Sequence, residues 1–327
     1  MRGVMAWGDR HQVGLYLVAI AVGAVVGLLA PALTQPLEVA INPMLGLLLY
    51  ATFLGVPFTA IGRAFTDRRF LGVVLVLNFV VVPVVVFGLS RVVAFDQAVL
   101  VGVLFVLLTP CVDYVIVFTG VAGGARARLL AATPLLMLLQ VLLLPLYLWL
   151  MAGAEVVSVF DPHPFVEAFL LLIVLPLVLA AATQQLGTRF RSGRAVERVV
   201  LAAMVPLMML TLAVVVGSQI FGVSGALGQL LVAVPVFIIF VLVVAPLGAF
   251  LGRVARLDVP GRRAVTFSGV TRNSLVVLPL ALALPASFAL TPLVVVTQTL
   301  VELVAMMVMV TVVPRLIRPR SSSADAV

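Results

Sequence analysis

Long apolar runs follow one another along almost the whole of this 327-residue chain. Each is about 20 residues long, the length that an α-helix needs to cross the hydrocarbon core of a bilayer. Lipid offers no hydrogen-bond partners to the backbone, so we expect helices rather than an open sheet. The sequence therefore predicts an all-α integral membrane protein with ten transmembrane helices. The ten runs are 13–30, 43–61, 70–89, 98–121, 127–151, 164–182, 199–217, 227–250, 264–284 and 292–314.

Composition excludes several classes of protein. Hydrophobic residues make up 64% of the chain and charged residues only 10%, whereas soluble domains carry about 25% charged residues. The one cysteine, Cys111, precludes an intrachain disulfide, and His11 and His163 lie outside the apolar runs. We therefore expect no zinc site built from histidines within the membrane and no other cofactor. A transporter is favoured over a soluble enzyme and, since a His-Glu-x-x-His motif is lacking, over an intramembrane enzyme.

The arginines predict the orientation of the spans. All 20 basic residues are arginines, and 18 of them fall on one side of a ten-span topology. Only Arg91 falls on the other side, while Arg272 lies inside a span. The positive-inside rule makes the arginine-rich side cytoplasmic. We expect a multi-pass protein of the plasma (inner) membrane with both termini in the cytoplasm, a lipid bilayer around it and no nucleic-acid partner.

Two halves of five spans each are expected to form an inverted repeat. Residues 1–155 would hold spans one to five, with the N-terminus cytoplasmic, and residues 156–320 would hold spans six to ten. Residues 321–327 are expected to be a disordered cytoplasmic tail. An odd number of spans per half turns the second half upside down, and this arrangement is common in secondary transporters. We interpret the first run as a retained span rather than a cleaved signal peptide.

One interrupted helix is expected in each half, at spans four and nine. Pro110 follows Thr109 in span four, and because proline cannot donate to the preceding turn it favours a break. The matching stretch of span nine is 269–274, with Thr271 at the break. Transporters with such helices bind solutes near the membrane midplane between the broken ends. The sequence therefore predicts a solute site where these two segments meet.

Three ionisable residues lie inside spans: Asp113, Arg272 and Glu302. Each costs at least ~2.5–3.5 kcal/mol on insertion scales, so such residues face the protein interior and mark functional sites. We expect all three to bind substrate together with Asn273, and Asp113 or Glu302 to carry a coupling proton. Structural roles stay open: Asp113 as a cap of its half-helix, and Arg272 as the ion-pair partner of either carboxylate.

Cys111 has two interpretations. A single membrane cysteine is usually a small apolar packing residue. A position just after a proline, at the start of a half-helix, favours thiolate character, and thiolates bind soft, thiophilic solutes. Both interpretations stay open from position alone.

Several motifs resemble a known family. Thr109-Pro110-Cys111, followed by 115–119 (VIVFT) and 122–124 (AGG), resembles span four of the arsenical-resistance-3 family of arsenite efflux permeases. That family has ten spans and belongs to the bile acid:sodium symporter superfamily. Three further features are similar: Asn78 with Pro83 in span three, Gln140 in span five, and 300–302 (LVE) in span ten. The resemblance implies that Cys111 contacts the metalloid and that Glu302 is a functional residue.

Span nine departs from both branches of this superfamily. Its Thr271-Arg272-Asn273-Ser274 is closer to the sodium-coupled bile acid branch, yet Ser268 and Arg272 stand where that branch carries sodium ligands. Leu275 stands where the arsenite branch carries an acidic residue, and Asp113 is not typical of that branch. The leading hypothesis is efflux of arsenite or antimonite coupled to protons. The alternative is transport of an organic anion, with Arg272 as its partner and sodium as a possible coupling ion.

Overall fold

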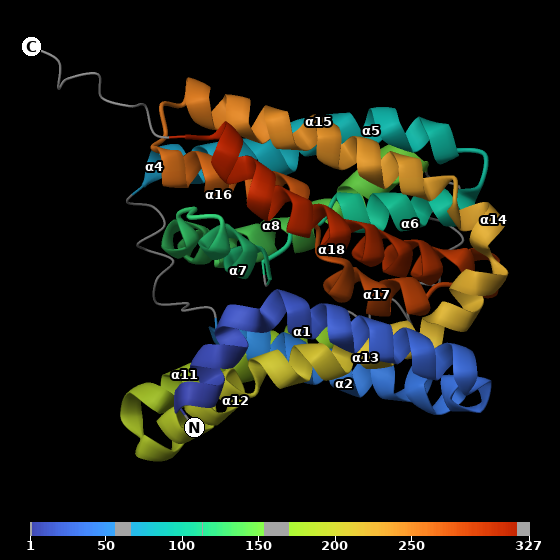
Figure 1. Ribbon diagram of the computed structural model, residues 1–327, viewed down its shortest axis with the longest axis horizontal. Helices are drawn as coiled ribbons and strands as arrows, with labels where there is room; N and C mark the ends of the chain where they lie inside the picture. The colour runs from blue at the N-terminus through green and yellow to red at the C-terminus, as the bar shows by residue number, and fades with distance from the viewer. Residues whose placement is uncertain (1, 56–66, 113, 154–169, 319–327) are drawn as a thin grey trace, which may run out of the picture.

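The computed structural model describes residues 2–55, 67–112, 114–153 and 170–318, and every regular element in these ranges is a helix. The helices form two groups (Figure 1). The small bundle comprises α1 (Arg2–Leu29), α2 (Thr34–Gly55), α11 (Leu175–Arg189), α12 (Arg191–Ala202) and α13 (Met204–Gly225). The large bundle comprises α4 (Arg68–Val76), α5 (Val82–Ser90), α6 (Gln97–Leu107), α7 (Tyr114–Val121), α8 (Arg126–Ala152), α15 (Ala233–Val254), α16 (Val259–Val270), α17 (Ser274–Leu282) and α18 (Leu290–Leu316).

Short helical elements complete the chain. The 3-10 helices are η1 (Pro31–Leu33), η4 (Arg91–Val93) and η6 (Ala286–Phe288), and π-helical turns occur at η3 (Leu77–Val81) and η5 (Leu170–Val174). The four-residue α14 (Leu227–Leu230) leads from the small bundle to the large one.

The apolar runs are helical wherever they are described. Within the described ranges, six helical stretches are long and apolar enough to cross a membrane, which confirms a helical membrane protein. The ten-span count, the inverted repeat and its two halves stay predictions. The expected tail at 321–327 and parts of the second and sixth runs lie outside the described residues.

Apolar side chains cover the outside of the molecule as well as its interior. Leu142 on α8 is 70% exposed and Leu242 on α15 is 67% exposed, whereas every residue of α6 from Ala98 to Leu107 is buried. A soluble protein would not leave so many large aliphatic side chains in water. The exposed residues form the lipid-facing surface of a protein whose core lies around α6.

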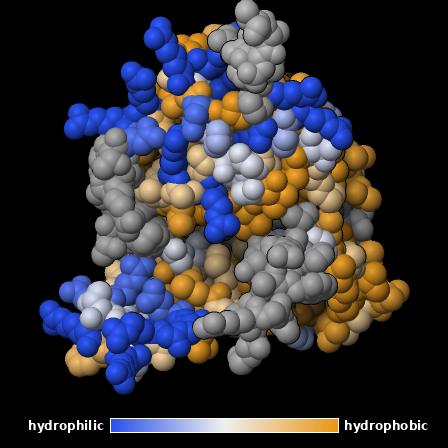
Figure 2. Space-filling view, turned by 60° about the vertical axis from the view of Figure 1, so that its left-hand side comes forward, coloured by the Kyte–Doolittle hydropathy of each residue, from blue (hydrophilic) through white to orange (hydrophobic). Residues whose placement is uncertain are grey.

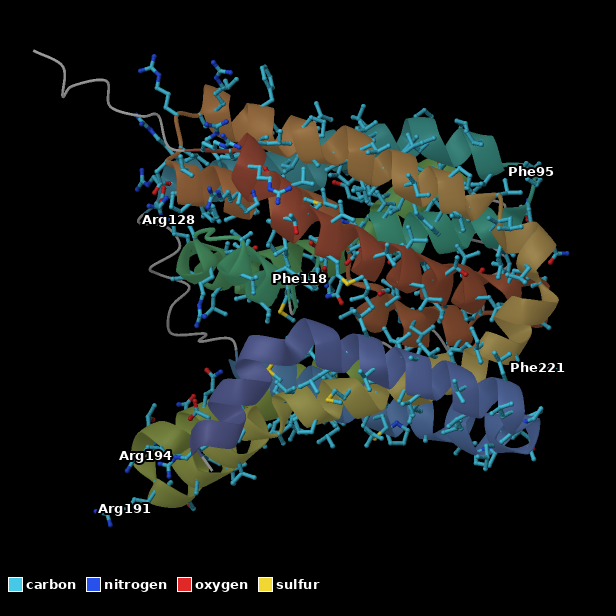
Figure 3. The ribbon with its side chains drawn as sticks, viewed as in Figure 1. Phe95, Phe118, Arg128, Arg191, Arg194 and Phe221 are labelled. Atoms are coloured by element: carbon cyan, nitrogen blue, oxygen red, sulfur yellow. The ribbon has the colours of Figure 1, made fainter. Side chains whose placement is uncertain are left out.

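Polar and apolar residues sort along the long axis. Arg128, Arg191 and Arg194 lie at one end of the molecule, and Phe95 and Phe221 lie at the other (Figure 3). Figure 2 shows hydrophilic side chains gathered on the face that contains the first of these ends. We call the end that contains Arg128, Arg191 and Arg194 the arginine-rich end. The arrangement agrees with the expected distribution of arginines, and the cytoplasmic orientation of this end stays a prediction.

Glycines allow α1 and α13 to pack closely in the small bundle. A Cβ atom added at Gly23 would overlap the carbonyl oxygen of Ala213, and one at Gly27 would overlap that of Gly217. Small residues four apart let membrane helices approach until their backbones touch, which maximises van der Waals contact where no hydrophobic driving force acts. The small bundle is therefore held by backbone-to-backbone packing along α1.

Candidate functional site: a crossing of two interrupted helices

Two helices of the large bundle are interrupted at the same place. α6 ends at Leu107 and α7 begins at Tyr114, while α16 ends at Val270 and α17 begins at Ser274. The intervening segments meet in a single antiparallel bridge between Pro110 and Arg272. Pro110 and Thr271, the residues at which the sequence predicts the breaks, lie in these two segments.

Backbone hydrogen bonds close this crossing. The N–H of Cys111 donates to the carbonyl of Thr271 at 3.0 Å, and the N–H of Asn273 donates to the carbonyl of Thr109 at 2.9 Å. Non-helical backbone is tolerated at membrane depth only where such groups are satisfied inside the protein. The hydroxyls of Thr109 and Thr271 also donate back to carbonyls of their own helix, Thr109 to Phe105 and Thr271 to Phe267. The crossing is thus a built, hydrogen-bonded element.

Arg272 lies at the centre of the crossing and is fully buried. Its Nη2 donates to Asn78 Oδ1 at 2.8 Å and to the carbonyls of Ser268 and Gly269 at 2.7 and 2.5 Å, and its Nη1 donates to the carbonyl of Leu107 at 3.3 Å. These carbonyls lie at the ends of α6 and α16, where helical donors run out and the helix dipole is negative. We call these four oxygens the oxygen cage. They surround a permanent cation.

The ring of Phe240 covers the same guanidinium, with the Arg272 Cζ atom 5.5 Å from the ring centroid. A cation over an aromatic face is attracted by the ring quadrupole. The oxygen cage and the aromatic ring from α15 together offset the cost of burying the charge of Arg272.

Asn78, whose Oδ1 belongs to the oxygen cage, is part of a π-helical turn. It lies in η3, between α4 and α5, and its Nδ2 donates to the Val74 carbonyl at 2.9 Å and to Ser268 Oγ at 3.0 Å. These two bonds orient Oδ1 toward Arg272. Pro83 cannot donate to the preceding turn, and the Phe79 carbonyl accepts instead from the Tyr147 hydroxyl at 2.6 Å. π-Turns occur frequently at functional sites.

The carboxylate of Glu302 lies at the crossing as well. Glu302 is 1% exposed on α18, and its Oε2 accepts from the backbone N–H of Arg272 at 2.9 Å and from Gln298 Nε2. The structure therefore brings two of the three predicted intramembrane charges together, through the main chain of Arg272. Asp113, the third, lies outside the described residues.

The remaining predicted site residues are buried beside these groups. Cys111 is fully buried in the crossing, and Asn273 caps α17 through Oδ1, which accepts from the N–H of Val276 at 3.4 Å. Within the described part of the chain, Asn273 Nδ2 and Gln298 Oε1 have no hydrogen-bond partner. One buried donor group and one buried acceptor beside the crossing are thus unpaired among the described residues.

Three participants were not predicted as site residues. Asn78 was noted only as part of a family pattern, and Gln298 and Ser268 were given no binding role, although Gln298 lies one helical turn before Glu302. Thr299 Oγ1 further donates to, or accepts from, Ser274 Oγ at 2.7 Å, which ties α17 to α18. Gln140, which the family resemblance highlights, is buried on α8.

An apolar helical exterior around a crossing of broken helices defines a membrane transport protein. The chain belongs to the sodium bile acid symporter family, whose sequence profile matches residues 42–225. The matched region includes Asn78 and Cys111 and ends before Arg272 and Glu302. Curated proteins give no match to the chain. Members of this family are multi-pass membrane transporters rather than enzymes, which agrees with the class expected from the sequence.

Proposed function

We propose that the protein is a secondary transporter that exports arsenite or antimonite and is driven by protons rather than sodium. The observation that carries this proposal is the occupation of the oxygen cage by Arg272. The solute part rests on Cys111 and on the resemblance to arsenite permeases.

The cage has the chemistry of a sodium site. Hard cations are coordinated by carbonyl and amide oxygens, and the four oxygens around Arg272 are of this kind. A sodium ion about 4 Å from the guanidinium would be repelled by about 4 kcal/mol at an effective dielectric constant near 20. Arg272 therefore acts as a covalently attached substitute for the ion, and sodium gains nothing by binding.

Glu302 is the group that takes the coupling proton. Its ionised carboxylate accepts the N–H of Arg272, which belongs to the crossing backbone. Protonation removes the negative charge and weakens this charge-assisted bond. A proton on Glu302 thus changes how firmly α18 is held to the crossing, which links proton binding to the geometry of the solute site.

Cys111 provides the contact for the solute. Trivalent metalloids are soft and bind thiolates in preference to oxygen ligands. The unpaired Asn273 Nδ2 and Gln298 Oε1 suit the hydroxyl groups that such a solute carries in water. Cys111 is inaccessible in the present conformation, so the solute reaches it when the two bundles move relative to each other.

Transport of an organic anion is the second candidate, because it is the usual activity of the family. Arg272 would then be the anion's partner. The guanidinium already donates to four oxygens, so an anion would have to displace them at the cost of leaving buried acceptors unpaired. This favours the metalloid.

The test is flux of radiolabelled or mass-detected arsenite into everted vesicles, with proton and sodium gradients imposed separately. We expect uptake that follows the proton gradient, is indifferent to sodium, and loses its pH response in Glu302→Gln. Flux that requires sodium would refute the coupling proposal. Flux of organic anions without metalloid flux would refute the proposed solute. The coupling proposal would then be decided separately, by the response of that flux to the proton and sodium gradients.

A further inference from the structure

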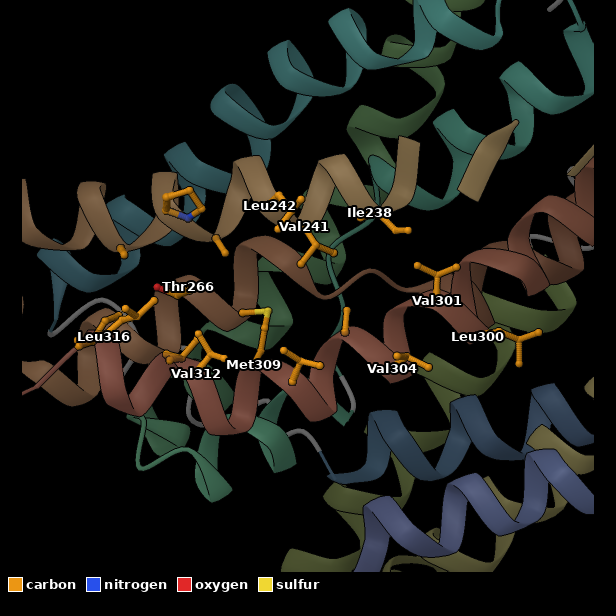
Figure 4. Close-up of a pocket in the computed structure, with 17 residues that line it drawn as sticks. Ile238, Val241, Leu242, Thr266, Leu300, Val301, Val304, Met309, Val312 and Leu316 are labelled. Carbon is orange, nitrogen blue, oxygen red and sulfur yellow. The ribbon is translucent and has the colours of Figure 1, made fainter. Parts of the chain in front are cut away.

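A long groove runs between α15 and α18 on the lipid-facing side of the large bundle (Figure 4). Its volume is about 800 Å³, and its lining is apolar except for Thr266, contributed by α16. Ile238 and Leu242 line one wall, and Val304 and Val312 line the other. The groove lies outside the crossing and plays no part in the proposed transport chemistry.

The dimensions of the groove suit a lipid acyl chain. Along α18 its lining extends from Leu300 to Leu316, which corresponds to about 24 Å at 1.5 Å per residue. One leaflet of the hydrocarbon core is about 15 Å thick, half the bilayer value. A chain lying in the groove can therefore run along the bilayer normal from the arginine-rich end to beyond the midplane.

Apolar lining alone would not select one lipid from another. Lipid tails are as apolar as leucine side chains, so a groove in a bilayer gains little from the hydrophobic effect. Selection has to come from the end of the groove where a headgroup would lie.

Three arginines mark that end. Arg253 lies one turn beyond Ala249 on the groove face of α15, Arg262 lies one turn before Thr266 on α16, and Arg315 immediately precedes Leu316 on α18. Arg253 and Arg315 are exposed. Each of the three helices that line the groove therefore carries a basic residue near the arginine-rich end.

Arg262 adds a second, independent observation. Its side chain packs against Gly252 of α15, and its Nε is buried without a hydrogen-bond partner among the described residues. The nearby acidic residue Asp258 is already engaged, since both of its carboxylate oxygens accept from Arg128 at 2.7 and 3.1 Å. The positive end thus keeps an unsatisfied donor and is not neutralised by Asp258.

We propose that this groove is a binding site for an anionic phospholipid, with one acyl chain between α15 and α18 and the phosphate on Arg253, Arg262 and Arg315. The headgroup supplies negative charge and oxygen acceptors to this basic end of the groove. The bound lipid lies against the face of α18 that includes Leu300 and Val301, directly beside Glu302 in sequence.

Native mass spectrometry of the purified, delipidated full-length protein tests the proposal. The probe is an equimolar mixture of phosphatidylglycerol and phosphatidylcholine with identical acyl chains. We expect one phosphatidylglycerol to be retained in preference. The preference should fall about fivefold for each arginine removed in Arg253→Gln and Arg315→Gln, because one basic residue near an anionic headgroup changes the affinity about fivefold.

Two further variants separate the groove from general surface charge. Ala305→Phe fills the groove from α18 and should abolish retention of both lipids, and Ala249→Phe does the same from α15 if the first variant does not fold. The double variant Arg191→Gln with Arg194→Gln removes two arginines from α12, distant from the groove, and should keep the wild-type preference. Equal retention of the two lipids by the wild type, or a preference that survives both groove-filling variants, would overturn the proposal.

Discussion

Replacing Arg272 by glutamine tests directly whether a guanidinium occupies a cation site. Glutamine is shorter and uncharged, so it removes the donor from Asn78 Oδ1 and from the carbonyls of Leu107, Ser268 and Gly269. It also adds an amide oxygen at the centre of the crossing. The variant therefore presents oxygen ligands without the fixed positive charge.

The loss of stability can be estimated from these contacts. A buried acceptor left without a donor costs about 1–3 kcal/mol. If two of the four oxygens stay unpaired, the crossing loses roughly 2–6 kcal/mol, which corresponds to a decrease in the melting temperature on the order of 10 °C. Sodium that binds only the folded variant at 100 times its Kd would restore about 2.7 kcal/mol.

The assay is thermal unfolding of the purified protein in detergent, in sodium chloride and in choline chloride at equal ionic strength. The Arg272→Gln variant should melt below the wild type in choline and recover part of the difference in sodium. The wild type should show the same melting temperature in both salts.

Arg263→Gln is the matched control for this experiment. Arg263 also donates to carbonyls at a helix end, those of Ala122, Pro314 and Ile317, but at the arginine-rich end of the molecule. Its loss should lower stability without a sodium response. A sodium response of the wild type, or an Arg272→Gln variant as stable as the wild type in choline, would show that the guanidinium is not the substitute for an ion.

Three further predictions concern the solute, the packing and the orientation. Cys111→Ser should abolish metalloid export in an arsenite-sensitive bacterium that lacks its own efflux pump, at unchanged protein level; full resistance would leave Cys111 as a packing residue. Gly27→Leu should destabilise the protein by about 1–3 kcal/mol through overpacking against α13, whereas Gly14→Leu, where nothing lies within 4 Å, should be nearly neutral in the same thermal assay. A reporter fused after Gly124 should be active in the cytoplasm and one at Gly225 outside; a cytoplasmic reporter at Gly225 would contradict the ten-span topology.

The helical fold and the interruptions could be predicted because their causes are local. Apolar runs of membrane length require helices, and Pro110 marks the break in its helix through the donor that it lacks. The charged residues Arg272 and Glu302 also indicated a site in the membrane. Ionisable residues inside spans are costly and rare, and they usually mark functional sites.

The partners of these residues could not be predicted because they come from distant helices. Asn78 and Arg272 are separated by 194 positions of sequence, and Asn78 lies in a π-helical turn that was not predicted from the sequence. The ion pair of Arg272 with a carboxylate, which the sequence left open as a structural role, stays a prediction. The hydrogen bonds of the Arg272 guanidinium to carbonyls at two helix ends depend on how α6 and α16 cross, which is a property of tertiary packing. Gln298 could have been found from its position one turn before Glu302.

The crossing itself is made by main-chain atoms: Cys111 and Asn273 are joined to Thr271 and Thr109 through N–H and carbonyl groups. Such bonds are formed by almost any pair of residues, so they do not depend on the thiol of Cys111 or on the amide of Asn273. The Asn273 amide contributes separately, as the cap of α17. Substitution of these two side chains changes the solute contacts that we propose, while the backbone bonds of the crossing persist. On the proposed function, a new cargo therefore requires substitutions at a few positions of a backbone scaffold that stays intact.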